Sequence, residues 1–557
     1  MLRKIFIAAA IFFTCVTNVF AAVEIPVNRC GEDVFWDFEN GTLIISGEGE
    51  MANYLIEDKD SEHYGWFYGT PWNDLKPSVT KIIIIDGVTS VGSHAFTDMD
   101  NLKTVEISDS VNFIGSQAFV NCKNLETVNL PGSVKFGKGV FENCPRLSNM
   151  QISSGGKNLV ASKNLNAHEY TRWAKPINSY LYVDGENLIR VENINGRLVV
   201  EKYSPEFELV DSRSVDFEFE IWGGFYAGRD ANFVIVGKSN DAESESAEVI
   251  RIAKFDKNWN YLSDAKIYGA NTKNPFAFAS LRCAESGGKL YIRTGHQMFR
   301  SSDGLNHQSN MTSTLDESAM KFSDVSYLVE HNATGYVSHS FNQHILIDSD
   351  KNILLFDHGD AFPRAALLNR YKNAAAGGKF RGSTENIELV KFAGKVGDNA
   401  TGAAIGGIAE TDSGYVSVYA YDGVGGSPDD FWNVINLRSL YAAFTSKNNF
   451  SGGGTKTVKI PLSDENFSAG VPILVPVSKS GGYIFCNELA FNGRHFETGG
   501  KIFIARYGSG GVETVGSFEG GLSDCQPIIY NGKIVWYVTE NTAPEFYIFD
   551  GRNLIRK

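Results

Sequence analysis

The stretch between Ser78 and Ile152 repeats itself, and this repetition constrains the fold more than any other feature of the sequence. The segment from Val88 to Phe96 aligns with the segment from Val111 to Phe119, so that each anchor residue recurs 23 residues later. A third copy runs from Val134 to Phe141, with one residue deleted before Phe141. A fixed period in the low twenties predicts a solenoid, in which each coil buries its apolar edge only by stacking on its neighbours.

The repeat also predicts which side chains face inward. Phe96, Phe119 and Phe141 occupy the same position of successive coils, so we expect them to stack in a column. The positions expected to face outward are polar and would either meet a partner or only be solvated: Lys103, Glu106, Glu126 and Asn129. About three coils are predicted, which offers a small surface.

The repeat resembles the BspA-like (Treponema-type) leucine-rich repeats of bacterial and protist surface proteins. The residues that carry the resemblance are Val88, Gly92, Ala95, Phe96 and Leu102 in one copy, and Val111, Gly115, Ala118, Phe119, Cys122 and Leu125 in the next. It covers about a quarter of the chain and assigns residues 78–156 to these repeats. The resemblance implies a secreted or surface-displayed protein that adheres to matrix proteins or other cells.

The first residues have the pattern of a secretory signal peptide. Arg3 and Lys4 precede an apolar run, and a small-residue cleavage site ends at Ala21, which predicts a signal over residues 1–21. The alternative is a membrane anchor, for which the run is short. No second long apolar run follows, so we expect no transmembrane segment in the mature chain, and a secreted, extracellular or cell-surface location. The net charge of -14 argues against a nucleic-acid partner.

Residues 22–77 are expected to cover the exposed end of the solenoid. The Asn40-Gly41 pair lies between two apolar runs, which predicts a β-hairpin. An insertion rich in aromatic residues follows, and these side chains either form a contact surface or pack over the hairpin. They are Tyr64, Trp66, Phe67, Tyr68 and Trp72.

Two cysteines occupy one repeat position on adjacent coils. Cys122 and Cys144 are therefore expected about one inter-strand spacing apart, roughly 4.8 Å. That distance is compatible with a disulfide if the side chains face each other. We favour the alternative of two buried thiols, because free cysteine is commonly buried.

Residues 157–176 are interpreted as a linker, and residues 177–557 as a β-propeller-like domain of roughly seven blades. Short apolar strands alternate with glycine, aspartate and asparagine turns, at intervals of 50 to 68 residues. The strand landmarks are Val183, Phe233, Leu290, Ile353, Val416, Ile484 and Ile534. A strand near Tyr180 is expected to complete the last sheet. A pair of β-sandwiches and a β-helix are the alternatives.

Polar motifs in the propeller region provide the candidate ligand-binding residues, which are expected to converge on the propeller axis. They are Arg293, His296, His307, His339, Asn342, Gln343, Asp357, His358, Asp360 and Arg364. Three interpretations remain open: carbohydrate or peptide binding, a metal site built from His296, His339, His358 and Asp360, and bridging of neighbouring blades without any ligand. Similar strings resemble a module of unassigned function that accompanies such repeats in surface proteins of anaerobic bacteria.

No catalytic residue and no cofactor can be assigned from the sequence. The segment from Arg300 to Asn306 resembles an Asp-box turn, in which Asp303 would accept backbone N–H groups and stabilise a hairpin. The acidic residues do not suggest the pair of carboxylates that a glycosidase needs. We therefore expect a binding or adhesion protein that recognises an extracellular protein or glycan through the repeat edge or the mouth of the propeller channel. A carbohydrate-active enzyme and an architectural envelope component are the alternatives.

Overall fold

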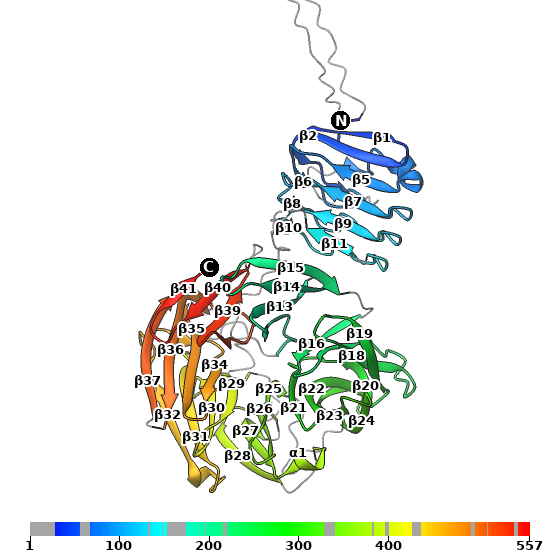
Figure 1. The fold of residues 1–557 in the computed structure, drawn as a ribbon. Coiled ribbons are helices and arrows are strands. Elements are labelled where there is room, and N and C mark those ends of the chain that lie inside the picture. The colour runs from blue at the N-terminus through cyan, green and yellow to red at the C-terminus, as the bar shows by residue number, and fades with distance from the viewer. Residues whose placement is uncertain are drawn as a thin grey trace, which may run out of the picture.

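The computed structural model of the chain consists of two mainly β parts, a solenoid followed by a ring of sheets (Figure 1). The described residues are 28–55, 67–131, 134–147, 149–152, 174–194, 197–215, 220–327, 340–361, 363–380, 384–395, 400–425, 436–491, 496–509, 511–539 and 544–557. The predicted signal peptide lies outside them. Among the residues described, no helix is long and apolar enough to cross a membrane.

The solenoid is built from two rows of short parallel strands. The longer row contains β5 (Lys81–Ile84), β7 (Thr104–Ile107), β9 (Thr127–Leu130) and β11 (Asn149–Ile152). The shorter row contains β6 (Val88–Val91), β8 (Phe113–Ile114) and β10 (Lys135–Phe136). The strand β2 (Thr42–Met51) belongs to both rows, because its first half pairs with β5 and its second half with β6. The period seen in the sequence therefore corresponds to one strand of each row.

The repeated glycine marks the point where successive coils approach most closely. An ideal Cβ on Gly115 would lie 2.4 Å from the backbone nitrogen of Ser93, and one on Gly137 would lie 2.4 Å from that of Ser116. A side chain at either position would require the coils to separate. The glycine of the repeat is thus explained by stacking distance.

The predicted aromatic column is confirmed. Phe96 stacks on Phe119 with ring centroids 5.1 Å apart, and Phe119 stacks on Phe141 at 5.3 Å. Trp72 extends the column beyond Phe96 at 5.3 Å and is fully buried. Trp72 therefore packs over the first coil rather than forming a contact surface. Tyr64 and Trp66 lie outside the described residues.

The N-terminal end carries the predicted hairpin, formed by β1 (Gly31–Glu39) and β2. Asn40 and Gly41 form its turn, both with positive φ, at 51° and 79°. Three short elements follow: β3 (Tyr54–Leu55), β4 (Phe67–Tyr68) and the 3-10 helix η1 (Asn73–Ser78).

Cys122 and Cys144 are present as two buried thiols that do not form a disulfide. The Cys122 thiol donates to the carbonyl of Phe96 at 3.2 Å, and the Cys144 thiol donates to that of Phe119 at 3.1 Å. A hydrogen bond with Cys144, together with burial, raises the pKa of Cys122 well above its ordinary value. Each thiol therefore satisfies a carbonyl of the preceding coil.

The second part is a seven-bladed β-propeller, as predicted. Blade 1 contains β12 (Ser179–Asp184), β13 (Asn187–Ile194), β14 (Arg197–Tyr203) and β15 (Leu209–Val215). Blade 2 contains β16 (Ile221–Ala227), β17 (Asn232–Gly237), β18 (Glu248–Phe255) and β19 (Tyr261–Tyr268). Blade 3 contains β20 (Thr272–Pro275), β21 (Arg282–Ser286), β22 (Lys289–Arg300), β23 (Asn306–Asp316) and β24 (Lys321–Ser326). Blade 4 contains β25 (Ser340–Ile347), β26 (Ile353–Asp360), β27 (Arg364–Tyr371) and β28 (Thr384–Lys391), with the short helix α1 (Ala374–Gly377).

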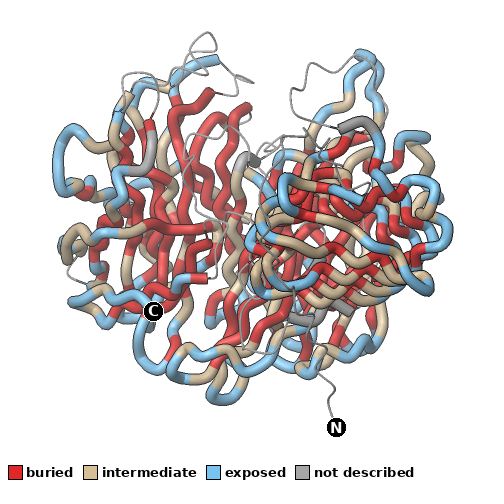
Figure 2. The backbone as a smooth tube through the Cα atoms, turned by 90° about the horizontal axis from the view of Figure 1, so that it is seen from above, coloured by how far each residue is buried: buried red, intermediate tan, exposed pale blue. Residues whose placement is uncertain are grey.

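The remaining blades complete the ring. Blade 5 contains β29 (Ala403–Glu410), β30 (Gly414–Tyr421), β31 (Ser439–Ser446) and β32 (Thr455–Ile460), with the 3-10 helix η4 (Gly452–Gly454). Blade 6 contains β33 (Ser468–Ala469), β34 (Ile473–Ser478), β35 (Gly481–Phe491), β36 (Phe496–Gly508) and β37 (Gly511–Glu519). Blade 7 contains β38 (Ile528–Tyr530), β39 (Lys533–Val538), β40 (Glu545–Phe549) and β41 (Leu554–Arg556). Buried residues concentrate in the strands of the blades and exposed residues in the turns (Figure 2).

The first strands of the blades form the inner edge of the ring, because β21 contacts β25, β25 contacts β29, and β12 contacts β38. In blades 3 and 6 two short strands share the first position, because β20 and β21 both pair with β22, and β33 and β34 both pair with β35. With these counted as one position, six of the seven sequence landmarks lie on the second strand of a blade, whereas Val183 lies on the first strand of blade 1.

The prediction for ring closure is wrong. The strand near Tyr180 is β12, which pairs with β13 in blade 1, and blade 7 has four strands of its own. The ring closes through side chains instead. Arg190 of blade 1 forms buried ion pairs with Glu192 and Glu201, and the Tyr537 hydroxyl of blade 7 donates to Glu192 at 2.8 Å.

The solenoid and the propeller share a hydrophobic core. Ile194 and Val199 of blade 1 belong to the same buried cluster as Leu147 of the last coil, and β11 contacts β15. Blade 1 therefore covers the end of the solenoid opposite the hairpin.

Candidate functional site

The outer face of the longer solenoid row presents two columns of side chains, which we call the ladder face. Strand register aligns alternate residues of β2, β5, β7 and β9 at one inter-strand spacing. The first column contains Thr42, Lys81, Thr104 and Thr127, and the second contains Ile44, Ile83, Glu106 and Asn129. All eight are half-buried, whereas the residues between them, such as Ile82 and Val105, are fully buried.

The ladder face combines short hydroxyl side chains, an apolar pair and an ion pair. Lys81 and Glu106 lie on neighbouring strands with their charged atoms 2.7 Å apart. Lys103 and Glu126, predicted to face outward, are exposed beside the face. Threonine and isoleucine lose little side-chain entropy when they are covered, so the face suits contact with another protein.

Most of the predicted ligand-binding residues lie between blades rather than on the inner edge of the ring. Arg293 and His296 lie on β22, and Asp357, His358 and Asp360 lie on β26, which are second strands of their blades. Arg364 lies on the third strand, β27. The expectation that these motifs converge on the axis is therefore wrong for them.

Arg293 and Asp357 connect blades 3 and 4. Both side chains are fully buried, and their charged atoms lie 2.8 Å apart. Burial raises the pKa of Asp357, and the Arg293 charge opposes that shift. The pair bridges two blades, which corresponds to the third interpretation of the sequence.

Three further predicted residues are used in internal hydrogen bonds. The His296 ring contacts the Thr272 hydroxyl at 2.8 Å and the Tyr327 carbonyl at 3.0 Å. The His358 ring contacts the Thr401 hydroxyl at 2.6 Å. Arg364 donates to the carbonyls of residues 360, 393 and 400, at 3.1, 2.8 and 2.7 Å.

The remaining predicted residues are dispersed. Asn342 and Gln343 lie on the inner strand β25, where Gln343 donates to Asn310 at 2.7 Å. His307 is exposed and contacts Asp303 at 2.6 Å. Asp303 also accepts the backbone N–H of Leu305 at 2.9 Å, which confirms the hydrogen bond expected for an Asp-box turn. His339 lies outside the described residues.

No group of three or more His, Cys, Asp or Glu side chains that could hold a metal ion occurs within the described ranges. Of the metal ligands considered from the sequence, His296, His358 and Asp360 are all buried.

The structure brings together a different polar group, which sequence reasoning missed. Tyr180, Arg282 and His344 lie on the inner strands β12, β21 and β25, and Asp524 precedes the inner strand β38. Among the described residues, no hydrogen bond or ion pair ends on the Arg282 guanidinium, although it interacts electrostatically with Tyr180 and Asp524. Burial raises the pKa of Asp524 to about 6, and burial together with the Arg282 charge holds the pKa of His344 well below its ordinary value. An arginine without a direct partner can bind a carboxylate or phosphate by donating hydrogen bonds to it.

Tyr180, Arg282, His344 and Asp524 form what we call the inner group. Counting residues back from the landmark strands could have identified two of its members. Arg282 precedes the landmark Leu290 by eight residues, and His344 precedes Ile353 by nine, because each blade begins one strand before its landmark. His344 directly follows the candidate residue Gln343, but its place on an inner strand depends on the order of the strands within the blade.

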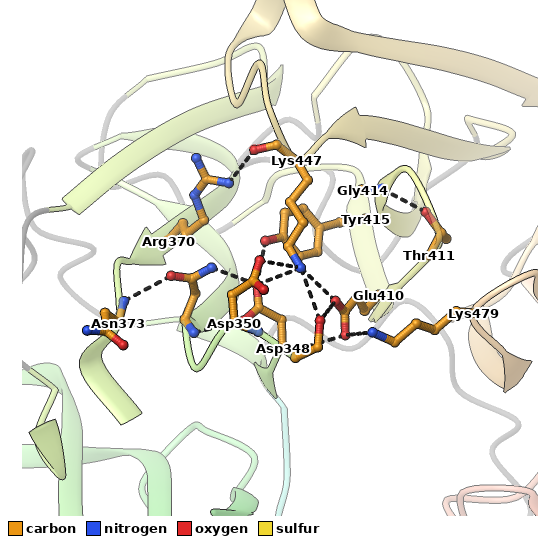
Figure 3. A network of polar contacts seen from close by, with 12 residues as sticks. Asp348, Asp350, Arg370, Asn373, Glu410, Thr411, Gly414, Tyr415, Lys447 and Lys479 are labelled. Atoms are coloured by element: carbon orange, nitrogen blue, oxygen red, sulfur yellow. Dashed lines mark hydrogen bonds and ion pairs between the residues drawn. The ribbon is translucent and has the colours of Figure 1, made fainter. Parts of the chain in front are cut away.

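A network of charged side chains links the turns of blades 4, 5 and 6 on one side of the ring (Figure 3). Lys447 pairs with Asp350 and Glu410, each at 2.7 Å, and Lys479 pairs with Glu410 at 3.1 Å. The Tyr415 hydroxyl donates to Asp348 at 2.7 Å. Hydrogen bonds from Lys447, Ser349 and Lys479 lower the pKa of Glu410 to about 2 against the effect of its burial.

Comparison with known families identifies the repeats. Residues 74–188 match the BspA type leucine rich repeat region in six copies, more than the three copies counted from the period. The matched region extends through β11 and reaches the first strands of blade 1. A BspA-type repeat region joined to a propeller fits a surface or binding protein. A comparison with curated proteins finds no match.

Solved structures resemble one or the other part. A leucine-rich repeat protein from Eubacterium ventriosum is 20% identical over 24% of this chain and 45% of that chain, with a TM-score of 0.16. This chain therefore spans less than half the length of that relative. A putative 6-phosphogluconolactonase from Bacteroides fragilis is 13% identical over 68% of this chain and 92% of that chain, with a TM-score of 0.36. An acylaminoacyl peptidase from Pyrococcus horikoshii is 10% identical over 68% and 52%, with a TM-score of 0.35. At such identities and TM-scores the likenesses carry no argument about activity.

Proposed function

We propose that the protein is a secreted or cell-surface binding protein whose ladder face docks an extracellular protein. The observation that carries this proposal is the alignment of half-buried side chains on four neighbouring strands, three of which lie within the region that matches BspA-type repeats. The inner faces of the same strands are buried in the core, whereas the outer side chains keep part of their surface accessible to a partner.

The chemistry of the ladder face supports a protein partner. Ile44 and Ile83 provide an apolar contact, and the paired Lys81 and Glu106 provide directional polar groups beside it. Protein interfaces combine an apolar centre with a polar rim. The face is small, so we expect moderate affinity, with a Kd of about 1 μM.

The experiment is a binding screen with the complete mature chain, labelled and applied to an array of extracellular proteins and glycans. The complete chain is needed because Ile194 and Val199 of blade 1 complete the solenoid core. A specific protein partner is the expected result. If no protein on a broad array binds, the proposed function loses its support.

The inner group favours a second candidate function, recognition of an acidic group at the inner edge of the propeller. Arg282 is a half-buried cation without a direct partner among the described residues, and its partial desolvation would be offset by a bound anion. Exchange of Arg282 for alanine should abolish binding of carboxylate- or phosphate-bearing ligands in the same screen and leave protein partners of the ladder face unaffected. Unchanged binding of acidic ligands by R282A would refute this second function.

A further inference from the structure

The charged members of the inner group face one another across the ring. Arg282 belongs to blade 3, and its guanidinium interacts electrostatically with Tyr180 of blade 1 and with Asp524, which precedes the first strand of blade 7. His344 of blade 4 is within range of the same charge. A side chain of blade 3 can reach groups of blades 1, 4 and 7 together only if it points inward. The Arg282 guanidinium therefore lies toward the axis of the propeller.

Asp524 is held by donors other than Arg282. Its carboxylate accepts the backbone N–H of Asn178 at 2.9 Å, and the Ser179 side chain adds a second hydrogen bond. In the part of the chain that the structure describes, no ion pair joins Asp524 to Arg282. The carboxylate thus acts on the half-buried Arg282 through its charge and does not occupy the guanidinium N–H groups, which a ligand can use.

The charge of Asp524 changes between acidic and neutral pH. Burial raises the pKa of this carboxyl from 3.8 to about 6, although its hydrogen bonds and the Arg282 charge oppose the shift. Above pH 6 the ionised carboxylate offsets the field of Arg282, and below pH 6 the neutral carboxyl leaves that field uncompensated. An anion beside Arg282 is therefore attracted more strongly at the lower pH.

Most of the other titratable groups that face Arg282 or Asp524 stay neutral over this range. Burial raises the pKa values of one tyrosine and two cysteines above their ordinary values: Tyr180, Cys283 and Cys525. Burial, together with the Arg282 charge, keeps the pKa of His344 well below its ordinary value, so the imidazole is uncharged as well. None of these four groups can produce a change in charge near pH 6.

Glu192 of blade 1 is the further acidic group that faces Asp524, and burial raises its pKa to about 7. It forms a buried ion pair with Arg190 and accepts the Tyr537 hydroxyl at 2.8 Å. Its charge is therefore compensated within the closure of blades 1 and 7. Asp524, which interacts with Arg282 directly, is the better placed of the two carboxyls to influence an anion there.

We propose that Asp524 makes anion binding at Arg282 dependent on pH, so that the inner group binds an acidic ligand more tightly in mildly acidic surroundings than at neutral pH. This inference rests on the second candidate function, recognition of an acidic group by Arg282, and adds a regulating residue to it. Asp524 need not touch the ligand, because its charge acts through the field at the guanidinium.

The test is calorimetry of the complete chain with sulfate and with lactate, at low ionic strength and at pH 5 and pH 7.5. Both probes keep their charge over this interval, so a change in affinity reports on the protein. We expect the parent to bind each probe about 5- to 10-fold more tightly at pH 5, since one repelling charge is removed.

Two variants assign this change to Asp524. D524N should bind at both pH values as the parent binds at pH 5, because an asparagine oxygen can accept the Asn178 N–H without carrying a charge. D230N is the matched control, since it removes an exposed carboxylate of blade 2, and it should show the pH dependence of the parent.

Proton uptake provides a second readout that a merely structural role would not produce. Binding and protonation are reciprocally linked, so an anion that binds near pH 6.5 should raise the pKa of Asp524 and take up a fraction of a proton. Calorimetry in two buffers of different ionisation enthalpy measures this uptake. D524N should show none.

Two outcomes would overturn the role of Asp524 and leave anion recognition intact. One is binding that is lost in R282A but does not change with pH in the parent. The other is a pH dependence that persists in D524N, since another group, such as Glu192, would then be the sensor. If R282A binds both probes like the parent, or if neither probe binds the parent at either pH, the second candidate function fails together with this inference.

Discussion

At the scale of single residues, the glycine of the repeat has the sharpest structural reason. Gly115 lies where a Cβ would come within 2.4 Å of the Ser93 backbone nitrogen. G115A should therefore lower the free energy of unfolding by about 2–3 kcal/mol, because the coils must separate to admit the methyl group. Urea denaturation measures the change. G377A is the control, since an added Cβ there meets no atom within 4 Å, and it should have little effect. Equal stability of both variants would contradict the stacking explanation.

The sequence predicts the packing of repeat residues well, because residues separated by one period occupy equivalent positions on adjacent coils. Phe96, Phe119 and Phe141 stack as expected, since equal spacing in a solenoid means adjacency in space. The histidines of the propeller carry no such information. His296 and His358 bind neighbouring side chains within the fold, and nothing in their local motifs distinguishes that use from a ligand site.

At the scale of elements, ion pairs join the turns of blades 4, 5 and 6. Glu410 has a folded-state pKa of about 2, below its ordinary value of 4.5. Its contribution to stability is therefore present above pH 4.5 and is lost as the pH falls toward 2. E410Q should lose about 2 kcal/mol of stability at pH 7 and show a smaller loss than the parent on acidification.

Thermal unfolding between pH 2 and pH 7 measures this dependence. D230N is the control, because Asp230 forms a single ion pair with Arg229 and both side chains are largely exposed. The Tm of D230N should depend on pH almost as the Tm of the parent does. If the Tm of E410Q changed with pH in parallel with the Tm of the parent, the stability of the network would not depend on this carboxylate.

The blade pattern was predicted from strand entry motifs, but the role of each strand was not. Ile353 and Ile484 mark second strands, so residues on the landmark strands lie between blades, and those on the strand before them lie at the inner edge. This offset explains why Arg293 was expected on the axis and Arg282 was not. Strand order within a blade depends on tertiary pairing, which spacing alone does not specify.

At the scale of the whole molecule, the ring closes without exchanging a strand between blades 1 and 7. The Tyr537 hydroxyl is one of the groups that joins them, because it donates to Glu192, whose other partner is Arg190. Y537F should reduce the free energy of unfolding by about 1–3 kcal/mol, since a buried carboxylate loses a donor. Y203F, which removes a hydroxyl that donates to Glu201 of the same blade, is the matched comparison.

Hydrogen exchange distinguishes the two tyrosine variants. Y537F should increase exchange in both β13 and β39, on the two sides of the closure, whereas Y203F should affect blade 1 first. Increased exchange confined to blade 7 in Y537F would contradict a closing role for the hydroxyl.

The most direct test of the proposed function is to alter the ladder face in the complete chain and measure binding to the protein partner found in the screen. T104R places a long side chain in the first column, and it should reduce affinity at least tenfold without a change in Tm, because Thr104 is only half-buried. D230K alters an exposed position of blade 2 and should bind like the parent. Loss of binding by T104R alone would support docking on the ladder face. Equal binding by T104R, D230K and the parent would contradict it and place the partner elsewhere on the molecule.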